Sequence, residues 1–250
     1  MTAETYLLAH SAINWLYILF VFASTFALYN LQRLFYTGKK FGDSKSERHR
    51  WIFEHRKLLL ALTVVASAGI TIFLFFFSMK FILWFSLLGF ISLSYFFPFT
   101  NFRSIPLVKA ALVALVWTCV TCFFPLIINS LPVDDCQGVF ARFFFLLSLA
   151  VVFNIRDIEI DRKSSVNTLP VIFGERATKI LCMIFLLFFS VLIIFSDYNL
   201  KIQIGFLVSS LVTAIMIFNA SESRSEYFYS LWMDGMIIFQ FLLIWVAVKP

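Results

Sequence analysis

The sequence predicts an all-α fold, a polytopic membrane helical bundle that forms one domain over residues 1–250. Of these residues, 61% are hydrophobic and only 14% are charged, and the mean hydropathy is +0.92. The apolar residues also gather in runs of about 20, the length of helix that crosses a bilayer. A soluble domain of this size does not need so much apolar surface. We therefore expect about eight transmembrane helices.

The first four expected helices cover 11–31, 58–78, 81–98 and 107–129. The first run is too long for a signal peptide. It ends in Tyr29-Asn30 rather than in the small residues of a cleavage site, so it is expected to be a span. A short hinge separates the second run from the third. The fourth contains Pro125, which predicts a kink because proline lacks the N–H that an interior helical residue donates.

The last four expected helices cover 138–156, 178–196, 202–219 and 227–248. The final one contains Asp234 about seven residues after its start, which places it roughly 10 Å deep at 1.5 Å per residue. An ionisable residue at such a depth is costly and usually faces a cavity or a partner. We expect Asp234 to line a cavity and to act in catalysis. The alternative is a carboxylic acid kept neutral by burial and hydrogen-bonded to a neighbouring helix.

Lysine and arginine are distributed unevenly between the two sides of these helices. With the N-terminus outside, 16 of the 20 fall in the inner segments 32–57, 99–109, 156–179 and 220–226. The outside keeps Lys80, Arg142, Lys201 and Lys249. This asymmetry follows the positive-inside rule and places the inner segments in the cytoplasm. The net charge of +6 then faces anionic lipid, so nucleic-acid binding is not implied.

The inner segment 37–57 has the composition of a helix that lies in the membrane surface. It contains E-R-H-R-W-I-F-E-H-R-K, in which charged residues alternate with Trp51 and Phe53. We expect these two aromatic side chains to enter the lipid, which makes membrane lipid a partner of the chain.

The residues with the clearest chemistry follow the fifth expected helix. If that helix continues, Asn154, Asp157 and Asp161 fall at i, i+3 and i+7 and share one face. Two carboxylates one turn apart beside an amide suit Mg²⁺, which prefers oxygen ligands and is often shared with substrate phosphates. The alternative is a pair of solvated acids that are balanced by the basic residues around them, Arg156, Arg162 and Lys163.

The end of the first expected helix is similar to the end of the fifth. Tyr29 to Arg33 reads Y-N-L-Q-R, and Phe153 to Asp157 reads F-N-I-R-D. Both stretches end a helix that runs from outside to inside, and four spans separate them. This indicates a tandem of two four-helix halves. Asn30 then matches Asn154, and a base, Arg33, stands where the second half has Asp157.

With these motifs, the chain resembles the UbiA superfamily of intramembrane prenyltransferases. The family's second Asp-rich motif is matched by Asp157-x-x-x-Asp161 and by the T-L-P-V-x-x-G tail at 168–174. The S-Y-x-x-P stretch at 94–98 and the segment 106–109 are similar to the family's connection between its third and fourth helices.

The resemblance implies a helical bundle with two Asp-rich motifs at the mouth of a central cavity. In the family each motif holds Mg²⁺, and the ions bind the diphosphate of an isoprenyl donor. Ionisation leaves an allylic carbocation that an aromatic or other acceptor captures. The chain departs from this pattern at the first motif, normally N-D-x-x-D, where Leu31 follows Asn30 and Arg33 stands at the place of the next Asp. It also has eight expected spans where family members commonly have nine.

Arg33 has three interpretations. It could bind diphosphate directly with its guanidinium fork. It could form a structural pair with Asp157 or Asp161, which would neutralise the carboxylates that a metal needs. It could also serve only as a positive anchor on the inner side. Arg103 and Lys109 lie on the same side, where they could bind phosphate or lipid headgroups.

The sequence therefore predicts a Mg²⁺-dependent enzyme that transfers a prenyl group from an isoprenyl diphosphate to a lipophilic acceptor, with an aromatic acceptor favoured. Asp157 and Asp161 would hold the metal, Asn30 and Asn154 would orient phosphate or metal-bound water, and Arg33 would offset the leaving-group charge. The protein is expected in the plasma (inner) membrane if it is bacterial, with its active face in the cytoplasm. The alternative function is non-catalytic lipid binding or transport on the same scaffold.

Overall fold

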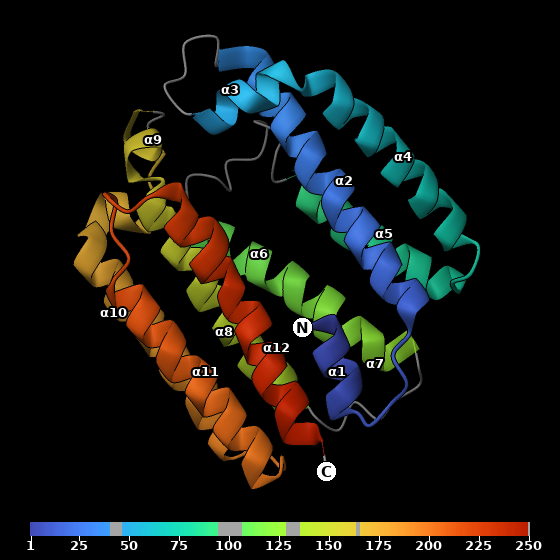
Figure 1. Ribbon diagram of the computed structural model, residues 1–250, viewed down its shortest axis with the longest axis vertical. Coiled ribbons are helices and arrows are strands. Elements are labelled where there is room, and N and C mark those ends of the chain that lie inside the picture. Colours follow the sequence, from blue (N-terminus) through green and yellow to red (C-terminus); the bar gives the residue numbers. More distant parts are fainter. Residues whose placement is uncertain (41–46, 95–106, 129–135, 164–165, 250) are drawn as a thin grey trace. The chain divides into compact units, whose positions relative to one another are not determined.

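The computed structural model describes residues 1–40, 47–94, 107–128, 136–163 and 166–249 (Figure 1). Within these ranges the regular structure is helical, and no strand occurs. Six helices are long and apolar enough to cross a membrane: Arg56–Leu74, Val108–Ile128, Gln137–Arg156, Leu169–Ile194, Leu200–Phe218 and Phe228–Val248. These features confirm an all-α, multi-pass membrane protein.

The expected first and third spans correspond to shorter apolar stretches, Trp15–Leu31 and Met79–Leu93. The first expected span was predicted to end at residue 31. The helix instead continues to Lys40. The sixth expected span begins nine residues earlier than its predicted start at 178, because the helix there starts at Leu169. Hydrophobicity alone placed these ends, and it does not detect a helix that continues into polar sequence.

The chain divides into two compact units, each described separately below. Unit 1 contains Met1–Ile13 and Phe97–Pro250, and unit 2 contains Asn14–Phe96. A single domain, a central cavity and a repeat of two four-helix halves all stay predictions.

Unit 1 is built around one buried helix, α8. Its elements are α1 (Thr2–Leu8), α6 (Val108–Thr118), the π-helix η2 (Cys119–Phe123), α7 (Phe124–Ile128), α8 (Cys136–Arg156), α9 (Ile158–Lys163), α10 (Leu169–Ile194), α11 (Leu200–Phe218), the π-helix η4 (Phe228–Met233) and α12 (Asp234–Val248). Helix α8 packs against α6 and α10, and α11 packs against α10 and α12. Aromatic contacts join three of these helices, since the Phe189 ring of α10 lies 5.3 Å from Phe145 of α8 and 5.9 Å from Phe206 of α11.

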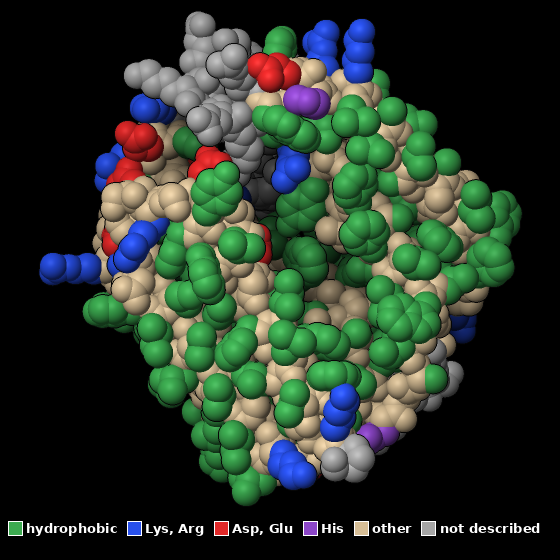
Figure 2. All heavy atoms as spheres, viewed as in Figure 1, with side chains coloured by type: hydrophobic (Ala, Val, Ile, Leu, Met, Phe, Trp, Pro, Cys, Tyr) green, Lys and Arg blue, Asp and Glu red, His purple; other side chains and the backbone are tan. Residues whose placement is uncertain are grey.

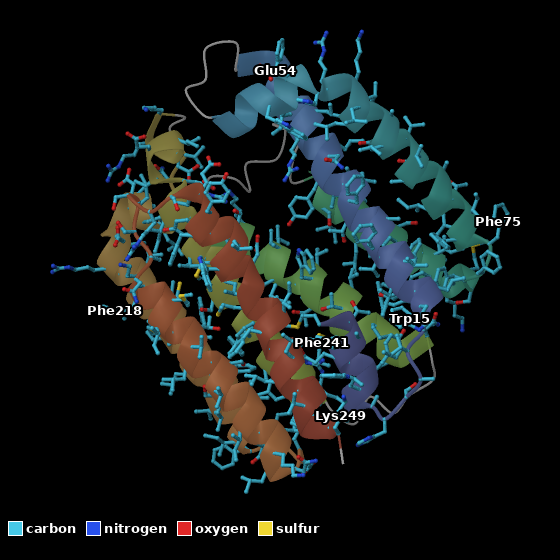
Figure 3. All side chains as sticks on the ribbon, viewed as in Figure 1. Trp15, Glu54, Phe75, Phe218, Phe241 and Lys249 are labelled. Carbon is cyan, nitrogen blue, oxygen red and sulfur yellow. The ribbon has the colours of Figure 1, made fainter. Side chains whose placement is uncertain are left out.

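Unit 2 contains α2 (Trp15–Lys40), α3 (Glu47–Glu54), α4 (Arg56–Leu74) and α5 (Met79–Ser94). Helices α2 and α4 pack side by side and run in opposite directions, so Trp15 at the start of α2 and Phe75 after α4 lie at the end away from Glu54 (Figure 3). A cluster of phenylalanines holds the three long helices together. Phe20 of α2 is fully buried, and its ring lies 4.6 Å from that of Phe85 and 5.1 Å from that of Phe77.

Pro125 changes the fourth span, as predicted, and the change takes a specific form. The five residues before Phe124 form the π-helix η2, and Pro125 cannot donate a hydrogen bond to the carbonyl of Thr121, four residues earlier. That carbonyl accepts instead from the hydroxyl of Thr5 at 2.9 Å. The irregular turn therefore provides the attachment point for α1.

A buried charged group fixes α1 from a second side. Arg142 of α8, which the charge distribution assigns to the outer side, is only 1% exposed. Its guanidinium donates to the Thr5 hydroxyl at 2.7 Å and lies 3.9 Å from the carboxylate of Glu4. Burial raises the pKa of Glu4, and nearby positive charges, among them Arg142, offset this only in part.

Candidate functional site

The predicted metal motif lies where α8 ends. Helix α8 stops at Arg156 and α9 begins at Ile158, so Asp157 occupies a turn between them. The fifth expected span, 138–156, therefore ends where it was predicted to end, and the condition that the helix continues through the motif is not met. The helical spacing survives the break, because the N–H of Asp161 donates to the carbonyl of Asp157 at 2.8 Å. Asp157 and Asp161 thus remain one turn apart.

The polar side chains of this motif differ in their exposure. Asn154 and Asp161 are buried, with 3% and 7% of their surface exposed. The Nδ2 group of Asn154 is buried and has no hydrogen-bond partner among the described residues. Glu159, between the two aspartates, is exposed and pairs with Lys163 across one turn of α9 at 3.9 Å. The site thus separates two buried polar groups from a solvated acid.

Asp157 has a close partner in the preceding residue Arg156, one of the three basic residues that the sequence offered as balancing the acids. The guanidinium donates from Nε to Oδ1 at 2.7 Å and from Nη2 to Oδ2 at 3.0 Å, a bidentate contact. The two side chains are 21% and 25% exposed. The same guanidinium lies 5.2 Å from the ring centre of Phe153, one turn earlier. Arg156 is therefore held between an aromatic face and a carboxylate.

Asp234 belongs to the same site. It is the first residue of α12, directly after the π-helix η4, and it is exposed. Asp234 and Glu226 contribute to the electrostatic environment of Arg156, although 78 residues separate Asp234 from Arg156 in the chain. The start of the last span lies against α8, because η4 packs on that helix.

Tyr229 fixes the start of the last span in place. Its hydroxyl donates to the carbonyl of Ser221 at 2.9 Å and accepts from the N–H of the same residue at 3.1 Å. Its ring lies 6.0 Å from that of Phe153. The π-helix η4, which contains Tyr229, turns the chain immediately before Asp234, and such wide turns often occur at functional sites.

The tail of the motif forms the start of α10. Thr168 is the N-cap residue, and its buried hydroxyl has no hydrogen-bond partner among the described residues. Gly174 interrupts the helix with φ +82° and ψ 166°, a conformation that is essentially restricted to glycine. The glycine of the T-L-P-V-x-x-G tail therefore sets the bend between the first turn of α10 and the rest of the helix.

In Figure 2, hydrophobic side chains cover the flanks of α10, α11 and α12, and acidic and basic side chains gather at the end where α9 lies. Figure 3 shows Phe218, the last residue of α11, toward this charged end and Lys249 at the far end of α12. At this end the Lys179 ammonium donates to the Phe218 carbonyl at 3.2 Å and pairs with Glu175 at 2.6 Å, which links α10 to the end of α11. The candidate site therefore lies at one end of an apolar helical unit.

The two predicted site residues of the first helix lie in unit 2. Asn30 of α2 is buried, with 3% exposed, and Arg33, one turn later, is exposed. Both line a hollow of about 250 Å³ along one face of α2. The other lining residues are Phe22, Thr25, Phe26 and Tyr29. One face of α2 thus presents aromatic side chains followed by a guanidinium.

The remaining predicted phosphate ligands are not brought to the site by any contact that we can describe. Lys109 is half-buried in the first turn of α6. Arg103 falls outside the described residues. The roles of both residues stay predictions.

The side chains at the end of α8 fit Mg²⁺ as a partly protein-bound ion. Asp157 and Asp161 offer carboxylate oxygens one turn apart, and Asn154 adds a buried amide. Within the described ranges, no group of three Asp, Glu, His or Cys is placed to hold a metal. The other ligands of a bound ion would then be water and phosphate oxygens, which is the usual way in which Mg²⁺ is bound.

The fold defines an integral multi-pass membrane protein, and Asp157 and Asp161 lie one turn apart at one end of its larger unit. The chain is similar to digeranylgeranylglyceryl phosphate synthase of Sulfolobus acidocaldarius, with 39% identity over 89 residues. The match covers 34% of this chain and 32% of that enzyme, so the chain spans about a third of the length of the curated relative it matches. No family model matches the chain, and no solved structure does.

Proposed function

We propose that the protein transfers a prenyl group from an isoprenyl diphosphate to a lipophilic acceptor within the membrane. The observation that carries this proposal is the site at the end of α8, where Asn154, Asp157 and Asp161 stand at the edge of an apolar helical unit. A prenyl diphosphate has the same division, with an apolar chain and an anionic head. A polar site that adjoins a membrane-embedded apolar region can bind both parts.

The reaction requires that charge on the departing diphosphate be stabilised. The donor's C–O bond breaks, diphosphate leaves, and the allylic carbon forms a bond to the acceptor, which loses a proton. Mg²⁺, when held by Asp157 and Asp161, supplies positive charge for the leaving group. Asn154 turns its buried amide N–H toward phosphate oxygens. Asp234 is an exposed carboxylate at the same end of the unit and takes the acceptor's proton.

Helix α2 of unit 2 has a group of residues of its own that suits a prenyl diphosphate. The hollow along α2 has aromatic walls, including Phe22, Phe26 and Tyr29, and Arg33 stands at one end of it. Phe22 and Phe26 stack with their ring centres 6.1 Å apart. The rings suit an isoprenoid chain and a developing allylic cation. The guanidinium suits diphosphate, which it binds with two parallel hydrogen bonds.

The relative's name suggests the first substrates to test. It denotes a glyceryl phosphate that carries two geranylgeranyl groups. We propose geranylgeranyl diphosphate as the first donor and a membrane lipid with a glycerol phosphate head as the first acceptor. An aromatic acceptor, which the sequence favoured, is the second choice because the relative's name contains none.

Non-catalytic lipid binding is the second candidate function, and one observation favours it. Arg156 occupies both carboxylate oxygens of Asp157. A protein that has lost catalysis would show this kind of neutralisation. It would bind a prenyl lipid and leave the C–O bond intact.

One assay separates the two functions. Purified protein in lipid nanodiscs is incubated with radiolabelled geranylgeranyl diphosphate and a membrane lipid extract, with Mg²⁺ or with EDTA. The enzyme transfers label to a product that lacks diphosphate, releases diphosphate only with Mg²⁺, and loses both activities in Asp161→Asn. Bound but intact donor, equal in Mg²⁺ and EDTA, contradicts catalysis and supports the lipid-binding function.

A further inference from the structure

We propose that Arg156 is a positioning latch, which holds Asp157 before the donor binds and transfers its guanidinium to the diphosphate afterwards. This inference rests on the proposed function, because it assumes that Asp157 receives a cation and that diphosphate binds beside it. It adds a residue that neither the motif nor the comparison assigns. In this scheme the neutralised Asp157 carboxylate is the state of the site before the donor binds, and it is compatible with catalysis.

The contact between Arg156 and Asp157 competes directly with a cation. Both carboxylate oxygens accept from the guanidinium, Oδ1 at 2.7 Å and Oδ2 at 3.0 Å. A cation that binds Asp157 must therefore share or displace these hydrogen bonds. Removing the guanidinium should make the carboxylate a better cation ligand, since a nearby positive charge opposes a second one.

Acidic residues other than Asp157 also contribute to the electrostatic environment of Arg156. It interacts electrostatically with Glu226 and Asp234 as well as with Asp157. With all three acids ionised, these four residues carry an excess of two negative charges, the charge of one divalent cation. These negative charges favour a cation beside Asp157 once the guanidinium has moved.

The side chain is also anchored so that only its end needs to move. The guanidinium lies 5.2 Å from the ring centre of Phe153. That ring contacts Tyr229, whose hydroxyl is fixed by two hydrogen bonds to Ser221. A guanidinium that pivots on a fixed aromatic face keeps its place while it changes partner. Arginine suits the second partner as well, because its fork matches phosphate oxygens.

The test measures two ligands separately on Arg156→Gln. The first is Mn²⁺ alone, followed by electron paramagnetic resonance of the free ion, and the second is inorganic pyrophosphate with Mg²⁺, followed by calorimetry. The latch predicts opposite effects: Mn²⁺ should bind about tenfold tighter, and pyrophosphate about tenfold weaker, the scale of one charge-assisted hydrogen bond. The matched control is Arg162→Gln, an exposed arginine on α9, which should change neither affinity.

Two further variants make every outcome decisive. Arg156→Lys keeps the positive charge and loses the fork, so it should bind Mn²⁺ like wild type and pyrophosphate more weakly, even if Arg156→Gln fails to fold. Wild-type affinity for both ligands in the two Arg156 variants overturns the latch. Asp157→Asn separates this failure from that of the proposed function: if it leaves Mn²⁺ binding unchanged, the metal site itself is wrong. If it abolishes Mn²⁺ binding, only the latch has failed.

Discussion

The N–H of Asp161 donates to the carbonyl of Asp157 at 2.8 Å, across the point at which α8 ends and α9 begins. This bond keeps the two acidic residues in helical spacing, because Asp157 directly precedes the helix that contains Asp161. It also allows them different surroundings: Asp161 is buried, and Asp157 is paired with Arg156. The buried Asp161 and the Arg156-paired Asp157 therefore lie at the same end of unit 1.

Arg33 should contribute directly to donor binding. Arg33→Ala removes a charge-assisted hydrogen bond worth roughly 1.5–3 kcal/mol, which corresponds to about a ten- to hundredfold loss of affinity. Arg33→Lys should recover only part, because the fork is lost. Calorimetry with a prenyl diphosphate, with and without Mg²⁺, measures the effect.

The control for Arg33 is Arg56→Ala, which removes an exposed arginine of α4 in the same unit. Equal affinities in wild type, the Arg33 variant and the control would leave Arg33 as a topological anchor. A gain in Mg²⁺-supported binding after Arg33→Ala would instead identify it as the partner of a carboxylate.

The buried arginine of α8 should stabilise unit 1. Arg142→Met removes the partner of Glu4 and the donor to Thr5, and breaking a buried charged pair costs about 3–5 kcal/mol. Glu4→Gln should also destabilise, because it leaves the buried Arg142 guanidinium without a carboxylate beside it. Equilibrium unfolding in mixed micelles measures both, with the exposed Lys201→Met as control. Equal stability of Arg142→Met and the control would show that the pair is dispensable.

Gly174 should resist substitution for a backbone reason alone. A Cβ at this position meets no atom within 4 Å, but φ is +82°. Gly174→Ala should therefore lower stability by about 1–3 kcal/mol, the cost of a non-glycine residue in this region. Gly69→Ala in α4 also meets no atom and should be neutral or stabilising, since alanine favours helices. The unfolding measurement contradicts this account if the two variants behave alike.

The charge distribution makes a prediction about topology. With 16 of 20 basic residues on one side of eight spans, both termini should lie outside. Reporter fusions at Lys45 and Ser165 should report the cytoplasm, and a fusion at Pro250 should report the outside. A cytoplasmic signal at Pro250 would mean an odd number of spans.

Much of the fold could be predicted from hydrophobicity, because a bilayer requires long apolar helices. The position of α1 could not. Its seven residues include the buried Glu4. Nothing in their sequence shows that α1 will bind the carbonyl freed by Pro125 and lie beside the charge of Arg142. Arg142 itself was assigned to the outside from its place near a helix start. Its burial depends on a partner more than 130 residues away.

The candidate acids come from the sequence, and the geometry of the arginine beside them does not. Spacing proposed Asn154, Asp157 and Asp161, depth in the last span proposed Asp234, and their roles stay predictions. Arg156 was named only as one of three basic residues that could balance the acids. Its bidentate contact with Asp157 could not be predicted, because neighbouring residues on a continuous helix do not face each other. The contact forms where α8 ends at Arg156 and Asp157 occupies a turn.

Asp157 and Asp161 are proposed to bind diphosphate through a metal, and the Mg²⁺ dependence of donor binding tests this role. Calorimetry of geranylgeranyl diphosphate in nanodiscs, with Mg²⁺ and with EDTA, is compared for wild type, Asp157→Asn, Asp161→Asn and Glu159→Gln. The last is the matched control, an exposed acid on the same short helix as Asp161. We expect Mg²⁺-dependent binding in wild type and in the control, and its loss in both aspartate variants with folding and insertion unchanged. Wild-type binding in both aspartate variants would contradict the claim and make these acids solvated residues of a loop.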